Sequence, residues 1–208
     1  VGNKQRVLVS DLSGKSNISF KANELDIKYK DSKEITGKLV SKVKDLEFEG
    51  YQFEAADASL ELILRELSGE YSPFFKVLDS KVHISYDESG TEKADATLKV
   101  LVGDDIEHTA SDGDGPVDAL NNALRKALAM FFPELKDVRL TDYKVRVLNE
   151  QEGTGAKVRV LIESAYEDDS WSTIGVSKNI IEASRQALSD SFNYRLAKLS
   201  NWSIKNKK

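Results

Sequence analysis

The 208-residue sequence contains no cysteine, so the chain can form neither disulfides nor thiolate metal sites. It also lacks an excess of positive charge, since its formal net charge is −5 and acidic and basic residues are interspersed. A nucleic-acid-binding surface requires a basic face, so we expect no nucleic-acid partner. No apolar run approaches the length of a membrane span, and no signal peptide is visible. These absences predict a cytoplasmic protein with no membrane partner.

The sequence has few residues of the kinds that build catalytic or metal centres. His83 and His108 are its two histidines, and neither has ligand partners at metal-binding spacing. The acid pairs at residues 104–105 and 168–169 fall in predicted turns, where aspartates commonly stabilise the turn itself. The Gly-Lys-Ser at residues 14–16 lacks the upstream glycine of a phosphate-binding loop. We therefore expect no catalytic residue, no metal site and no cofactor in this chain.

An internal repeat occupies the C-terminal part of the sequence. Residues 79–84 match residues 142–147, and residues 96–102 match residues 156–162. Each copy has three stretches of alternating apolar residues followed by apolar residues at helical spacing, which predicts three strands and a helix. One such unit would leave its sheet poorly covered, so the two units should pack together. The matched small residues of the helices are Ala119, Ala123 and Ala127 in the first copy and Ala183, Ala187 and Ser191 in the second.

Two helices are predicted between residues 34 and 69, with Gly50 ending the first and Gly69 ending the second. A boundary at Ser72-Pro73 divides the chain into a subdomain of short strands and a helical hairpin (residues 1–71) and a second domain (residues 72–208). The fold class is therefore α+β, with pseudo-symmetric βββα repeats at residues 72–136 and 137–208. The predicted buried faces of the two helices are Leu39, Val40, Val43 and Leu46, then Ala56, Leu60, Ile63, Leu64 and Leu67.

The stretch Gly113–Leu120 predicts a tight turn that leads into the first repeat's helix. Pro116 suits the first turn of a helix, and we expect Gly113 and Gly115 to adopt backbone conformations that are closed to other residues. A second glycine turn is predicted at residues 174–177, with Ser177 near the start of the last helix. Free N–H groups at a helix start can bind a carboxylate or a phosphate. The motif alone is more typical of an ordinary helix start, but its repetition favours two binding sites near a pseudo-twofold axis.

The run Gly113-Asp114-Gly115-Pro116-Val117-Asp118-Ala119-Leu120 resembles the regulatory-domain motif of the 2-isopropylmalate synthase and citramalate synthase family. Residues 142–148 and 175–184 resemble the citramalate synthase branch, and residues 49–56 resemble the linker that follows the family's catalytic barrel. The resemblance covers nearly the whole chain. Asp114 departs from the family pattern, which often has asparagine there.

In this family a metal-dependent (β/α)8 barrel condenses acetyl-CoA with a 2-oxo acid. In citramalate synthase the oxo acid is pyruvate, and the product (R)-citramalate feeds isoleucine biosynthesis. A C-terminal domain dimerises and binds the end-product amino acid. The barrel is absent from this sequence, which begins with Val1-Gly2 rather than methionine. The resemblance therefore implies a regulatory fragment that forms a homodimer, contacts its own missing barrel and is not catalytic by itself.

Together, the helix starts and the resemblance predict where a branched-chain amino acid effector binds. Its carboxylate would contact backbone N–H groups at residues 113–117 or 175–177, and its ammonium would contact Asp114 or Asp118. Isoleucine is the expected effector. A leucine-sensing 2-isopropylmalate synthase domain and a dimerisation module without effector remain alternatives. The predicted effector-binding residues are Gly113, Asp114, Gly115, Pro116, Val117, Asp118, Ala119, Leu120, Gly175, Val176, Ser177, Ile180 and Ala183.

Overall fold

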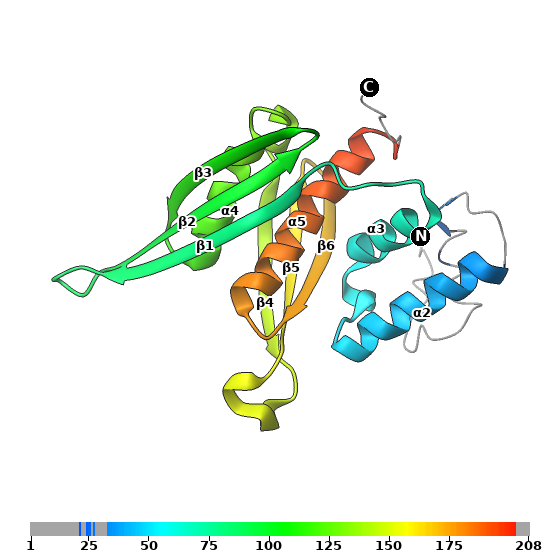
Figure 1. Ribbon diagram of the computed structural model, residues 1–208, viewed down its shortest axis with the longest axis horizontal. Coiled ribbons are helices and arrows are strands. Elements are labelled where there is room, and N and C mark those ends of the chain that lie inside the picture. The colour runs from blue at the N-terminus through cyan, green and yellow to red at the C-terminus, as the bar shows by residue number, and fades with distance from the viewer. Residues whose placement is uncertain (1–20, 22–23, 26, 28–32, 203–208) are drawn as a thin grey trace.

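The computed structural model consists of two βββα units preceded by a pair of helices (Figure 1). This arrangement confirms the predicted α+β fold with two repeats. The short strands predicted near the N-terminus lie outside the described residues. The structure describes residues 21, 24–25, 27 and 33–202. Its elements are α2 (Lys33–Glu49), η1 (Phe53–Ala55), α3 (Asp57–Ser68), β1 (Lys76–Tyr86), β2 (Glu92–Val102), β3 (Asp105–Gly113), α4 (Pro116–Leu128), η2 (Pro133–Leu135), β4 (Arg139–Val147), η3 (Glu150–Gly155), β5 (Val158–Tyr166), β6 (Asp169–Ser177) and α5 (Ile180–Leu199).

Each repeat forms its own three-stranded antiparallel sheet, in the order β1-β2-β3 and β4-β5-β6. The first strand of each sheet carries an irregularity at the equivalent place, between Val77 and Asp79 in β1 and between Leu140 and Asp142 in β4. A β-bulge of this kind bends the strand locally and is usually a built-in feature. Its recurrence shows that the two units share backbone detail as well as topology.

Equivalent buried threonines attach each helix to its sheet. Thr109 of β3 donates its hydroxyl to the carbonyl oxygen of Ala123 at 2.9 Å. Thr173 of β6 donates in the same way to Ala187 at 2.8 Å. The alanines bring the helix backbone close enough for this bond, and the bond satisfies a hydroxyl that would otherwise be costly to bury. The alanine matches in the sequence therefore mark the contact line between strand and helix.

One hydrophobic core joins the two repeats, because α4 and α5 pack against each other as well as against their own sheets. Alternate residues of β2 from Ala94 to Val102 are buried, as the period-two pattern predicts for a strand with one covered face. The largest fully buried side chains of this core are Leu98, Leu120, Leu124, Leu128, Ile162 and Phe192.

Helices α2 and α3 form the predicted hairpin, and Gly50 and Gly69 follow them with φ of +113° and +80°. Their predicted inner faces are buried apart from Ile63, which is half-buried, and Leu67, which is 41% exposed. The prediction for Leu67 was wrong because this residue, near the end of α3, lies beyond the surface that the neighbouring elements cover.

Helix α3 packs against α5 and β6, so β6 is covered on both faces (Figure 1). Ser59 of α3 donates to the Asp190 carboxylate at 2.7 Å and accepts the N–H of Ile174 at 3.1 Å. Tyr194 of α5 donates to the Glu61 carboxylate at 3.1 Å. Burial in this interface raises the pKa of Asp190 to about 7. The helical pair is therefore attached to the second repeat by buried polar contacts as well as by apolar packing.

Candidate functional site

Helix α4 begins where the sequence predicts, with Gly115 as the N-cap residue and Pro116 in the first turn. The expected reason for the two glycines was wrong. Gly115 has φ −166° and ψ 175°, an extended conformation that any residue adopts, and a Cβ there would meet no atom within 4 Å. Gly113 is required by packing, since a Cβ there would lie 2.2 Å from the backbone nitrogen of Ala119. Gly113 lets the end of β3 approach the helix closely.

The start of α4 is open to an anion. Gly115 makes no side-chain cap, and among the described residues no partner accepts the N–H groups of Val117 and Asp118. The Asp118 carboxylate accepts the N–H of Asp114 at 3.1 Å and the side-chain amide of Asn122 at 3.2 Å. Through these hydrogen bonds the exposed carboxylate stabilises the turn, and it places a negative charge beside the free N–H groups. The site therefore offers donors for a carboxylate and, next to them, an acceptor for an ammonium.

The start of α5 differs from the prediction. Gly175 lies within β6 and not in a turn, and α5 begins at Ile180 with Asn179 as its cap. The side chain of Asn179 accepts the N–H of Ile181 at 2.9 Å, and Ser177 accepts the N–H of Asn179 at 3.1 Å. Local sequence favoured Ser177 because serine is also a good cap, but the strand continues through it. The second helix start is thus partly closed by its own side chains.

Gly175 is explained by packing in the same way as Gly113. A Cβ on Gly175 would lie 2.0 Å from the carbonyl oxygen of Ala183. The next residue, Val176, is buried and donates its N–H to Gln186 at 3.1 Å. Gln186 also accepts the hydroxyl of Tyr51, from the segment between α2 and η1, at 3.3 Å. The second repeat's candidate residues are therefore in contact with the chain that precedes the repeats.

The predicted effector-binding residues differ in accessibility. Asp114, Asp118 and Ile180 are exposed, whereas Ala119, Leu120 and Ala183 belong to the core. Core packing therefore explains why these last three side chains are apolar. The accessible candidates for contact with an effector lie at the helix starts. Half-buried members of the set are Gly113, Gly115, Pro116, Val117 and Ser177, and the remaining buried members are Gly175 and Val176.

Exposed apolar residues lie at the same sheet ends as the helix starts. Ile84 pairs with Ala94, and Ala94 pairs with Gly113. In the second repeat, Val147 pairs with Val158, and Val158 with Ser177. Ile84 and Val147 share a sheet face with buried residues, yet they are 45% and 46% exposed. Uncovered apolar side chains grouped next to such a turn are typical of a ligand or partner surface.

Sequence reasoning missed this exposure. Alternating apolar residues predict strands with one covered face, but the alternation does not tell how far the covering helix extends. Tyr86, Val145 and Ile180 are also exposed apolar residues near these ends.

Within the described part of the chain, no helix has the length and apolar character to cross a bilayer, and no cluster of three or more histidine or acidic side chains is placed to hold a metal ion.

The model of the LeuA allosteric (dimerisation) domain matches residues 54–196, from η1 to α5. The chain belongs to this family. The match includes α3 and both repeats, so the LeuA domain contains the open helix start, the exposed edge strands and the interface with α3.

The relatives of this LeuA domain are biosynthetic enzymes. It is 50% identical to an (R)-citramalate synthase of Geobacter sulfurreducens, over 95% of this chain and 38% of that protein. It is 48% identical to an (R)-citramalate synthase of Aquifex aeolicus, again over 95% of this chain and 38% of the relative. A 2-isopropylmalate synthase of the same organism is 27% identical over 90% of this chain and 34% of its own length. The chain thus spans little more than a third of its relatives, and it is the regulatory, dimerisation part of the citramalate synthase family.

Proposed function

We propose that this LeuA domain is the isoleucine sensor of an (R)-citramalate synthase and that it works as a homodimer. The observation that carries the proposal is the contrast between the two Aquifex aeolicus enzymes, of which the citramalate synthase is far more similar to this chain. In the proposed enzyme a separate barrel joins acetyl-CoA to pyruvate, and this domain reports the level of the pathway's end product. By itself the domain is not catalytic.

The open start of α4 suggests how isoleucine is held. Its carboxylate accepts the free N–H groups of Val117 and Asp118, where the helix dipole favours an anion. Its ammonium lies beside the Asp118 carboxylate, which is exposed and already placed over the turn. Its aliphatic side chain packs on nearby apolar residues such as Val117 and Ile84, the latter being two strand spacings from Gly113.

Feedback requires that isoleucine bind one arrangement of the dimer more tightly than another. The exposed apolar residues of β1 and β4 provide a surface for a second copy of the domain. A copy that packs on this surface covers the helix starts. The preceding helices provide a route toward the barrel, because Tyr51 and Val176 share Gln186 as acceptor and Ser59 is bonded to Asp190. A change at the sheet ends is thereby transmitted to α2 and α3.

Isothermal titration with isoleucine, leucine and valine, together with the mass of the protein in solution, tests the proposal. A dimer that prefers isoleucine supports it. Preference for leucine instead assigns the chain to a 2-isopropylmalate synthase, because the two ligands differ only in the position of a methyl group. Such a difference is worth roughly 1–3 kcal/mol in an apolar pocket. A dimer that binds none of the three is a dimerisation module, and the sensing role is then wrong.

A further inference from the structure

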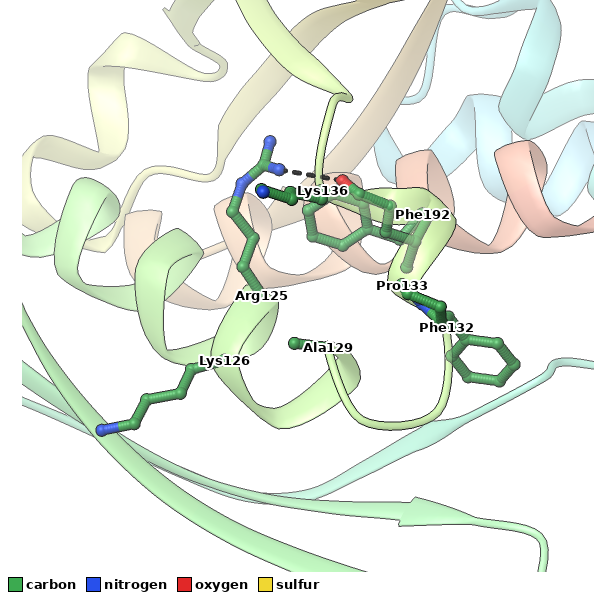
Figure 2. Close-up of a pocket in the computed structure, with 8 residues that line it drawn as sticks. Arg125, Lys126, Ala129, Phe132, Pro133, Lys136 and Phe192 are labelled. Carbon is green, nitrogen blue, oxygen red and sulfur yellow. Dashed lines mark hydrogen bonds between the residues drawn. The ribbon is translucent and has the colours of Figure 1, made fainter.

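A cavity of about 320 Å³ lies at the other end of α4, between this helix, η2 and α5 (Figure 2). Its walls are mostly apolar and are formed by Ala129, Phe132, Pro133, Leu135 and Phe192. This volume lies in the range of small-molecule sites, which typically combine apolar walls with a few polar groups. The open helix start is at the opposite terminus of α4, so the two sites are separate.

Arg125 supplies one positive charge at this cavity without an anionic partner. Its guanidinium donates to the carbonyl oxygens of Leu135 at 3.2 Å and Val138 at 2.5 Å, and to the Asn121 side chain at 3.3 Å. It also lies over the Phe192 ring, 5.0 Å from the centroid. Among the described residues no carboxylate pairs with it. Three of its five N–H donors are used, which leaves two for a ligand.

Lys136 provides a second unpaired charge. Figure 2 shows its ammonium on the same side of the cavity as the Arg125 guanidinium, and no ion pair of Lys136 occurs within the described part of the chain. Lys126 points away from the cavity, because its ammonium donates to the carbonyl oxygen of Ala110 at 3.1 Å. Lys136 is exposed, whereas Arg125 is half-buried, and a partly buried cation is normally compensated by an anion. Burial lowers the pKa of Arg125.

A cation at this place is not common to the two βββα units. The position equivalent to Arg125 in the second repeat is Ser189, in the alignment that pairs Thr109 with Thr173 and Ala123 with Ala187. The second helix packs on its sheet without an arginine at that point. The unpaired charge is therefore a feature of this cavity and not of the βββα unit.

We propose that this cavity binds a small apolar monocarboxylate that has no ammonium group. The carboxylate neutralises Arg125 and Lys136, and the hydrocarbon part packs against Phe132, Leu135 and Phe192. No acidic residue lines the cavity, so the ammonium of an amino acid would lie among like charges. The ligand class therefore differs from the amino acid proposed for the helix start, and either proposal can be refuted without the other.

The test uses 4-methylpentanoate as probe, with leucine and 4-methylpentanamide as comparators. Leucine adds only the ammonium, and the amide removes only the negative charge. Backbone amide NMR spectra of the chain should show saturable shifts at Ala129, Phe132 and Lys136 with the acid. At these amides both comparators should bind at least about tenfold more weakly, the expected cost of losing a charge-assisted contact. Equal binding of acid and amide, or no saturable shift at these amides, overturns the proposal.

Charge-reversed variants provide the second arm. Lys136→Glu should weaken 4-methylpentanoate binding by at least about tenfold, because the charge beside the cavity would then repel the ligand's carboxylate instead of attracting it. Lys81→Glu makes the same charge change at an exposed position of β1 and should leave binding unchanged. Gly115→Asp, at the other end of α4, should also leave it unchanged. If Lys136→Glu binds the probe as the parent does, the cavity is not the site.

Discussion

Gly115→Asp is the substitution that tests the open helix start most directly. The Gly115 backbone is extended, and a Cβ there would meet no atom within 4 Å, so the fold should tolerate the change. Aspartate is a preferred N-cap residue, and its carboxylate would accept the N–H groups that are free in the parent. We expect the free energy of unfolding to stay within about 0.5 kcal/mol of the parent or to rise slightly.

The same carboxylate would occupy the place of the effector's carboxylate. Loss of a hydrogen bond to a charged group costs about 1.5–3 kcal/mol, which corresponds to roughly 10- to 150-fold weaker binding. Isothermal titration with isoleucine measures this loss, and thermal unfolding of the same samples reports the fold. Gly115→Ala is the matched control, since it adds a Cβ but no acceptor and should keep isoleucine binding. If Gly115→Asp binds isoleucine as tightly as the parent, the carboxylate does not bind at this helix start.

Three further outcomes are expected from urea denaturation. Gly113→Ala should destabilise by about 1–3 kcal/mol or more, because its Cβ overlaps the first turn of α4; a loss no larger than that of Gly115→Ala would contradict the close contact. Thr173→Val should cost about 0.5–1.5 kcal/mol through loss of the bond to Ala187, and an unchanged midpoint would refute that role. Because burial raises the pKa of Asp190 from 3.8 to about 7, the folded state holds its proton over this interval while the unfolded state releases it. Stability should therefore fall as pH rises from about 4 to about 7, and Asp190→Asn should flatten that fall; an equally steep profile in the variant would exclude Asp190 as its source.

Much of the architecture was predictable because it depends on local patterns. Alternating residues identified the strands, and Gly50, Gly69 and Pro116 marked helix ends through their own backbone preferences. The repeat was visible because the same contact line of small residues has to recur wherever a helix packs closely on a strand. The turn that leads into α4 was located for the same local reasons.

The sequence by itself thus determined the elements, their order, the twofold repeat and the family. Tertiary structure decided what the individual residues do. Gly113 and Gly175 are required by helices packed against them, which no local preference reveals, and Asn179 caps α5 because β6 runs on through Ser177. The exposure of Ile84 and the unpaired charge of Arg125 likewise depend on which neighbours lie within reach. Local sequence sets backbone preference and periodicity, whereas burial, close approach and charge compensation arise only when distant segments meet.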